Sequence, residues 1–189
     1  MNEFGKVLRI VCGFLNENEI EYVVVGGIAI MYHGVPRTTT DIDLIVRMKT
    51  AEMGPFVAFL SSQGFHARIE DLTTALKEGS HCTFFYGRSL LRLDIQGVVS
   101  DFDRMTLERA VKVNHLGTIV SLATAEDTLV NKVYFQGEQD LRDALGIYVR
   151  IRDKLDLSYV ESTSRLLGVE NKWKSFLRRA AKQMKESTE

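Results

Sequence analysis

The stretch Val23-Val24-Val25-Gly26-Gly27-Ile28-Ala29 decides the fold of this chain, together with Arg37-Thr38-Thr39-Thr40-Asp41-Ile42-Asp43-Leu44-Ile45-Val46 shortly after it. The first is an apolar, β-branched run that two glycines interrupt, which is typical of a buried strand ending in a turn. The second stretch contains another apolar run, and that run begins with the acidic residues Asp41 and Asp43. We therefore expect buried strands over residues 22–25 and 42–46, joined through a short helix over 28–33.

The two acidic residues indicate a metal site. Asp41 and Asp43 are two positions apart, so on an extended strand both carboxylates lie on one face. Neighbouring carboxylates repel each other unless a cation lies between them. Mg²⁺ commonly fills this role, because it binds through one or two carboxylates together with the phosphates of a substrate. The pair therefore indicates a metal-dependent enzyme that handles phosphates.

The composition is that of one globular domain, or of one domain with a small helical appendage: 189 residues, 45% of them hydrophobic, support one buried core. A formal net charge of −1 gives no bulk attraction to nucleic acid, so such a partner would need a local basic patch. Charged residues interrupt the apolar N-terminus, and no apolar run is long enough to span a bilayer. Cys12 and Cys82 lack metal-ligand spacing and are typical of buried, reduced thiols. We expect a cytoplasmic protein with no membrane partner.

The remaining pattern predicts an α/β protein in the α+β arrangement, with a mixed β-sheet, flanking helices and a C-terminal helical segment. Before residue 122, helical spacing predicts helices over 2–16, from 50 to 64 and over 101–111, and a helical turn over 71–77. Alternating spacing predicts strands near 65–69, over 81–86 and 90–96, and over 111–115 and 118–121. After it, the pattern predicts helices over 124–136, 139–153, 157–167 and 171–186. We therefore assign residues 1–122 to a catalytic core and 123–189 to a helical segment packed on it.

A third acid lies in the predicted strand Leu90-Leu91-Arg92-Leu93-Asp94-Ile95-Gln96. Asp94 alternates with its apolar neighbours Leu93 and Ile95, so its side chain faces away from theirs. A carboxylate in such surroundings is costly unless it is paired, solvated or bound to a metal. If this strand pairs beside the strand of Asp41 and Asp43, three carboxylates converge, and they would hold two Mg²⁺ for attack on a nucleotide α-phosphate.

Taken together, these motifs resemble the DNA polymerase β-like nucleotidyltransferase superfamily. Within it, the chain is similar to the minimal bacterial and archaeal branch that contains abortive-infection-type toxin nucleotidyltransferases. The resemblance is carried by Gly26-Gly27, Asp41-x-Asp43, Asp94, Ala29–Thr40, Ala125–Lys132 and Gln139–Asp143. It covers about residues 20–150, and the combination of motifs is specific where each motif alone is not.

The resemblance implies a nucleotidyltransferase core that transfers a nucleoside monophosphate from an NTP to RNA (such as tRNA), a protein or a small molecule. In that reading Asp41, Asp43 and Asp94 are catalytic and bind two Mg²⁺ ions, with Mn²⁺ as an alternative. The nucleotide would be bound by Gly26, Gly27, Arg37 and Lys132. A toxin with an antitoxin partner is the corresponding biological role.

Each assignment has a structural alternative. Gly26-Gly27 is otherwise a simple turn, Arg37 otherwise forms a salt bridge with the aspartates, and Lys132 is otherwise a solvated surface lysine. The basic row of the predicted helix 171–186 either follows the phosphates of an RNA acceptor or is simply a solvated face. For the whole chain, the alternative is a non-catalytic nucleotide-binding or antitoxin-like interaction module.

Overall fold

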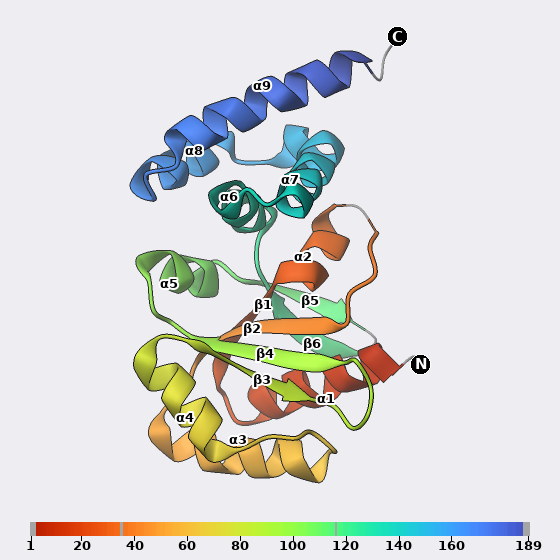
Figure 1. The fold of residues 1–189 in the computed structure, drawn as a ribbon, viewed down its shortest axis with the longest axis vertical. Helices are drawn as coiled ribbons and strands as arrows, with labels where there is room; N and C mark the ends of the chain where they lie inside the picture. Colours follow the sequence, from red (N-terminus) through yellow and green to blue (C-terminus); the bar gives the residue numbers. More distant parts are fainter. Residues whose placement is uncertain (1–2, 35, 116, 187–189) are drawn as a thin grey trace. The chain divides into compact units, whose positions relative to one another are not determined.

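The structure is a computed structural model that describes residues 3–34, 36–115 and 117–186. In this part of the chain the strands form one six-stranded mixed sheet in the order β3-β4-β2-β1-β6-β5 (Figure 1). The strands are β1 Glu21–Val25, β2 Asp41–Arg47, β3 His81–Phe85, β4 Arg92–Gly97, β5 Val111–His115 and β6 Thr118–Leu122. The α/β fold class predicted from the sequence is confirmed.

The register of the three central strands determines which side chains meet. β2 runs antiparallel to β1 and parallel to β4, and this places Val25, Asp43 and Asp94 side by side across the sheet. β3 pairs antiparallel with β4 and places Thr83 opposite Asp94. Partners in a ladder project from the same face, so the register collects the acidic side chains of two strands on one face.

The opposite face of these strands is apolar and buried. Ile42 and Leu44 of β2 and Leu93 and Ile95 of β4 are at most 1% exposed. The helices α1 Glu3–Glu17, α3 Thr50–Ser62 and α4 Ile69–Glu78 lie together beside this sheet (Figure 1). Phe14 of α1 stacks on Phe59 of α3, with ring centroids 4.4 Å apart. Burial of this apolar layer fixes the strand register, because a slip by one residue would turn the acids into the core.

One short helix lies on the acidic face instead. α5, Asp101–Glu108, begins with a capping box in which Ser100 and Asp103 bond to each other's backbone N–H groups. Asp103 also accepts a hydrogen bond from Gln96, which shares its face of β4 with Asp94. On the same face of the sheet, Phe85 of β3 pairs with Arg92 of β4 and is 48% exposed.

The helical segment after the sheet contains α6 Ala125–Phe135, α7 Glu138–Ile151, a 3₁₀ turn at Arg152–Lys154, α8 Leu157–Leu166 and α9 Glu170–Glu186. α6 begins at an N-cap threonine, Thr124, whose hydroxyl accepts a hydrogen bond from the Asp127 backbone N–H. Trp173 and Phe176 of α9 are buried, and their rings stack 5.4 Å apart. The predicted helices therefore exist, with ends within two residues of those expected.

Contacts divide the chain into two compact units. The first is Met1–Ile28 with Thr38–Ala123, and the second is Ala29–Arg37 with Thr124–Glu189. The helix α2, Gly26–His33, starts in the first unit and continues into the second. None of the helices that the structure describes combines the length and the apolar character needed to cross a bilayer.

One predicted element is wrong. Instead of a strand near residues 65–69, the structure has a single bridge between Phe65 and Tyr86, followed by α4 from Ile69. Both cysteines are free and buried, and burial raises the pKa of each thiol to about 12, as expected for unreactive core thiols.

Candidate active site

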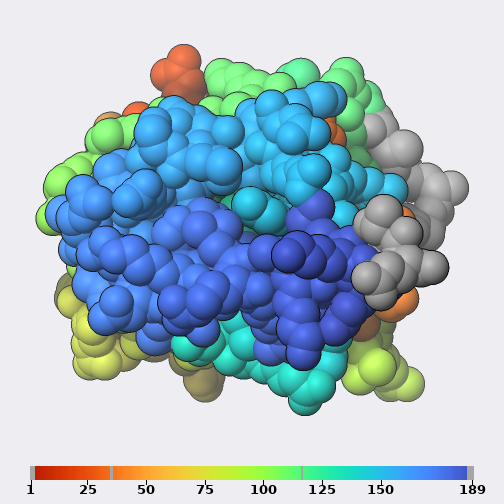
Figure 2. All heavy atoms as spheres, turned by 90° about the horizontal axis from the view of Figure 1, so that it is seen from above, coloured from red at the N-terminus to blue at the C-terminus, as the bar shows by residue number. Residues whose placement is uncertain are grey.

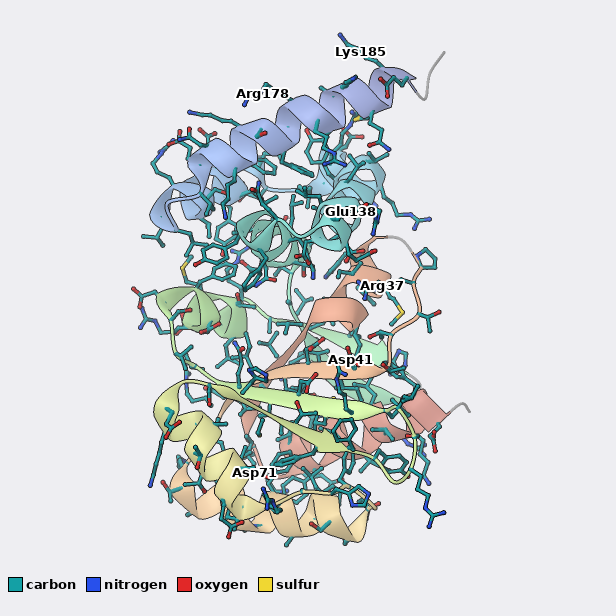
Figure 3. The ribbon with its side chains drawn as sticks, viewed as in Figure 1. Arg37, Asp41, Asp71, Glu138, Arg178 and Lys185 are labelled. Atoms are coloured by element: carbon teal, nitrogen blue, oxygen red, sulfur yellow. The ribbon has the colours of Figure 1, made fainter. Side chains whose placement is uncertain are left out.

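Three aspartates lie on one face of the sheet, on the neighbouring strands β2 and β4. Asp43 pairs with Asp94 across the parallel ladder, and Asp41 lies two residues before Asp43 on the same face. The side chains of Asp41 and Asp94 are 29% and 19% exposed, so they are accessible to solvent but not fully hydrated. The acids that the sequence predicted to converge do lie together, and Figure 3 shows Asp41 at the beginning of β2.

Gly26 packs directly against this cluster. Its φ is +61°, and a Cβ atom at this position would lie 2.0 Å from the Asp43 Oδ2 atom, where a side chain cannot fit. At Gly27, a Cβ would lie 2.8 Å from the Thr39 hydroxyl oxygen. Helix α2 begins at Gly26, so the two glycines bring backbone N–H groups that have no partner within the helix, and the positive end of the helix, beside the acids.

An arginine joins two of the acids. The Arg92 Nη2 atom donates to Asp41 Oδ2 over 2.8 Å, and Arg92 Nε donates to Asp94 Oδ2 over 3.0 Å. The hydrogen bond to Asp94, with the charges of the nearby aspartates, raises the pKa of Arg92 and keeps the guanidinium protonated. Arg92 is thus a cation held between two carboxylates that belong to different strands.

Two hydroxyls occupy the other oxygens of the same carboxylates. Thr83 donates to Asp94 Oδ1 over 2.5 Å, and Thr40 donates to Asp41 Oδ1 over 2.8 Å. Every carboxylate oxygen of Asp41 and Asp94 therefore accepts a hydrogen bond from Arg92 or from a threonine. These contacts fix the direction of both side chains, which is what a preformed site requires.

Sequence reasoning did not find Arg92 or Thr83. The signal for Arg92 was present, because it precedes Asp94 by two positions on a predicted strand and so shares its face. Thr83 carries no comparable signal, because its position opposite Asp94 depends on the register of the β3–β4 hairpin. That register follows from the turn geometry and is not readable from residue types alone.

Arg37 is held at a different acid from those expected. Its Nη1 atom donates over 2.7 Å to Oδ2 of Asp143 in α7, and both residues belong to the second unit. Asp143 is 6% exposed, and its other oxygen accepts a hydrogen bond from Gln139 over 2.8 Å. Arg37 is therefore an ion-pairing residue, and its acidic partner within the second unit is Asp143.

Lys132 also lies in an ion pair of the second unit. Its ammonium group donates to Asp140 Oδ1 over 2.7 Å, and the lysine side chain is only 15% exposed. Asp140 also accepts the backbone N–H of Gly137, which opens α7. Lys132 is thus not a freely solvated surface lysine; it links α6 to the first turn of α7.

The acidic cluster has the right chemistry for Mg²⁺. Carboxylate oxygens are the ligands that this ion prefers, and three carboxylates on adjacent strands supply them. Among the described residues, however, no group of three or more His, Cys, Asp and Glu side chains is placed so that it could hold a metal ion. In the acidic cluster, the Arg92 guanidinium binds one oxygen each of Asp41 and Asp94. The residue types of the three acids therefore suit the ion, and an arginine binds two of them.

Comparison with known structures supports the fold. An antigenic nucleotidyltransferase-like protein from Paracoccidioides brasiliensis has a TM-score of 0.56 and 16% identity, with 93% of this chain and 92% of that one covered. The crystal structure of ANT(2″)-Ia in complex with adenylyl-2″-tobramycin has a TM-score of 0.51 and 13% identity, covering 94% and 99%. The solution structure of the antibiotic-resistance factor ANT(2″)-Ia has a TM-score of 0.53 and 13% identity, covering 98% of each chain. At these identities the likeness concerns the fold alone.

The sequence itself gives the family. A search of curated proteins finds no match. A family model described as "Nucleotidyltransferase of unknown function (DUF6036)" matches residues 9–186, nearly the whole chain. The expected enzyme class, a nucleotidyltransferase, is thereby confirmed. The chain belongs to the DUF6036 family of nucleotidyltransferases.

Proposed function

We propose that this enzyme transfers a nucleoside monophosphate from an NTP to an acceptor hydroxyl, in a reaction that depends on Mg²⁺. The acceptor oxygen forms a bond to the α-phosphorus, and the bond from that phosphorus to the oxygen that bridges the α- and β-phosphates breaks. Pyrophosphate leaves with the electron pair of the broken bond, and the proton of the acceptor passes to a carboxylate of the site.

The proposal assigns a role to each acid. Asp41 and Asp43 hold the two metal ions, and Asp94 completes the site and accepts the proton of the acceptor. Bound Mg²⁺, for which Mn²⁺ is the expected substitute, stabilises the charge that develops on the phosphate oxygens. The observation that carries this assignment is the register in which Asp43 faces Asp94, with the glycine-opened end of α2 beside them.

The same arrangement supports a triphosphate site at Gly26 and Gly27. Their lack of side chains lets phosphate oxygens approach the backbone, and the first turn of α2 presents N–H donors and a positive dipole. Arg37 and Lys132 are the proposed side-chain ligands of the phosphates. Each forms one ion pair at 2.7 Å in the structure, and a guanidinium or an ammonium group has further N–H donors for a phosphate.

Arg37→Ala is expected to weaken NTP binding about ten- to a hundredfold, because a charge-assisted hydrogen bond to phosphate contributes roughly 1.5–3 kcal/mol. Calorimetry with an NTP and Mg²⁺ measures the effect. Arg142→Ala is the matched control, since Arg142 forms an exposed ion pair with Glu138 on α7 in the same unit. Equal NTP affinities of the two variants would assign Arg37 to a structural pair with Asp143 only.

Among the proposed acceptors, RNA is the one that α9 favours. This helix contains six basic and two acidic residues, although the whole chain has a net charge of −1. Its buried side carries Trp173, Phe176 and Ala180, and Lys174, Arg178, Lys182 and Lys185 lie on the exposed side. Figure 3 shows Arg178 and Lys185 pointing away from the helix, and in Figure 2 the dark blue atoms of α9 lie at the surface.

Two of these cations are the most available for phosphates. Lys174 forms an ion pair with Glu170 and Lys182 forms one with Glu186. Within residues 3–34, 36–115 and 117–186, no acidic partner is assigned to Arg178 or Lys185. A row of exposed cations along one helix face suits the regularly spaced charges of an RNA backbone, and tRNA is the acceptor that we propose.

Replacing both Arg178 and Lys185 by alanine is expected to weaken tRNA binding several-fold to about tenfold. It should also make the slope of log K against the logarithm of the salt concentration less steep by about 2. Fluorescence anisotropy over a series of salt concentrations measures both quantities. The control is Lys6→Ala with Arg9→Ala, which removes two exposed cations from α1. If the two double variants behave alike, or if anionic vesicles compete as well as RNA, the basic row is not an RNA site.

A cytoplasmic toxin that modifies tRNA and is neutralised by an antitoxin is the most specific form of this proposal. It rests on the resemblance of the Gly-Gly, Asp-x-Asp and Asp94 motifs to toxin nucleotidyltransferases. The function is tested by incubating the protein with Mg²⁺, each labelled NTP and a cell extract, which identifies the nucleotide and the acceptor together. Binding of an NTP without labelling of any acceptor would favour the non-catalytic nucleotide-binding module instead.

A further inference from the structure

Arg92 lies between two of the acids of the proposed metal site. Its side chain starts on β4 in register with Asp41 of β2, and it bonds to Asp41 and to Asp94 at 2.8 and 3.0 Å. A guanidinium and a divalent cation both compete for carboxylate oxygens. Because Arg92 uses oxygens of two of the three acids, a metal ion that binds these acids must share or take over the positions that Arg92 holds.

The contacts of the two threonines restrict the alternatives. Thr83 and Thr40 hold the Oδ1 atoms of Asp94 and Asp41, which leaves the Oδ2 atoms as the oxygens that Arg92 binds. Both Oδ2 atoms are directed to the same guanidinium, so they are the pair that converges on one cation. The Arg92 side chain is 40% exposed, so it has a path towards solvent when another cation replaces it.

We propose that Arg92 is a built-in counter-ion that holds the acidic cluster together without metal and that a divalent cation displaces from Asp41 and Asp94. The proposal rests on the proposed function, because it concerns the same three acids. It has two consequences of opposite sign. Arg92 stabilises the metal-free protein by separating the carboxylate charges, and it lowers the affinity of the site for a bare divalent cation.

This arrangement favours the cation that arrives with a nucleotide over the free ion. A bare cation must displace Arg92 using carboxylates alone, whereas a metal–nucleotide complex also supplies phosphate oxygens that a released guanidinium can bind. Arg92 would then act as a positioning residue that lowers the affinity of the site for free Mg²⁺ relative to the metal–nucleotide complex. If Arg92 is a counter-ion, its removal raises the metal affinity of the site. If Arg92 is instead a scaffold that aligns the acids, its removal lowers the metal affinity, so this measurement distinguishes the two roles.

The test is titration of the metal-free protein with MnCl₂ or MgCl₂ alone. Calorimetry measures the affinity for the cation, and thermal melting measures the stability with and without it. Arg92→Gln removes the charge but keeps a polar side chain, and we expect it to bind the cation about tenfold more tightly, since two partly exposed ion pairs each alter an equilibrium a few-fold. Its melting temperature should be lower than that of the wild type without metal and should rise more when metal is added. Arg92→Lys, which keeps the charge but not the two-pronged contact, should lie between the two proteins.

Two controls locate the effect. Arg47→Gln removes an arginine from the end of β2 opposite to Asp41, where it pairs with Glu21 and Glu108, and it should leave metal affinity unchanged. Adding Asp43→Asn to Arg92→Gln should abolish the gain in affinity. If Arg92→Gln unfolds, the Arg92→Lys protein still gives the direction of the change.

The proposal is overturned if the Arg92 variants bind the cation equally or more weakly, because Arg92 would then be a scaffold that aligns the acids. It is also overturned if neither the wild type nor any variant binds a divalent cation. A gain in cation affinity in the Arg92→Gln protein, together with no nucleotidyl transfer by the wild type, would support the counter-ion and contradict the proposed function, so the two failures are distinguishable.

Discussion

The Asp43→Asn protein is expected to fold normally and to lose nucleotidyl transfer by about a thousandfold. Asp43 faces Asp94 across the ladder, and a Cβ added at Gly26 would lie 2.0 Å from the Asp43 Oδ2 atom, so Asp43 lies at the centre of the cluster. Loss of a metal ligand removes charge stabilisation of several kcal/mol from the phosphoryl transition state, which corresponds to about three orders of magnitude in rate. Asparagine has nearly the same shape, so packing against Gly26 is retained.

The control for this variant is Asp71→Asn. Asp71 belongs to the same unit but lies on α4, where it pairs with Arg68 on the surface (Figure 3). Transfer by Asp71→Asn should match the wild type, and the melting temperatures of both variants should stay close to that of the wild type. A normally folded Asp43→Asn protein that transfers nucleotide at the wild-type rate would disprove the role of this acid.

Gly26→Ala is expected to lower the melting temperature by about 5–15 °C and to abolish transfer. A non-glycine residue at φ +61° costs about 1–2 kcal/mol. The new methyl group would lie 2.0 Å from Asp43 Oδ2 and force the carboxylate to move, at a further cost of about 1–3 kcal/mol. For a chain of this size each kcal/mol shifts the melting temperature by about 2–4 °C.

Gly87→Ala separates the two costs. Gly87 also has a positive φ, +55°, but a Cβ there meets nothing within 4 Å. This control carries the backbone strain without the collision, so it should melt higher than Gly26→Ala and retain full transfer. If both variants melt at the same temperature and transfer nucleotide equally well, the close approach of Gly26 to Asp43 has no functional meaning.

The central part of the fold was predictable because its signals are local. Apolar runs interrupted by glycine, the two-residue spacing of Asp41 and Asp43, and the lone acid at 94 are each visible in a short window. Alternation on β4 then places Asp94 on the face opposite to Leu93 and Ile95, which are fully buried. The one step that the sequence could not supply is that β4 pairs beside β2, in the register that aligns Asp43 with Asp94.

Other features depend on tertiary structure and were missed for that reason. Residues 65–69 have the composition of a strand, but no neighbouring strand pairs with more than Phe65, and α4 begins at Ile69. The partner of Arg37 is 106 positions away in α7, and no spacing rule reaches that far. Ala29–Arg37 groups with the C-terminal helices through its contacts in the folded chain. The sequence has no linker at the ends of this segment, so it gives no sign of that grouping. The division into a core of residues 1–122 and a helical segment of 123–189 stays a prediction.

The most direct test of nucleotidyl transfer follows the position of the label. The protein is incubated with Mg²⁺, tRNA or a cell extract, and an NTP that carries radiolabel either at the α-phosphate or at the γ-phosphate. The proposed reaction predicts that only the α-label enters the acceptor, that the γ-label appears in pyrophosphate, and that Asp43→Asn yields neither product. Transfer of the γ-label to the acceptor, or no transfer of either label with any NTP, would contradict it.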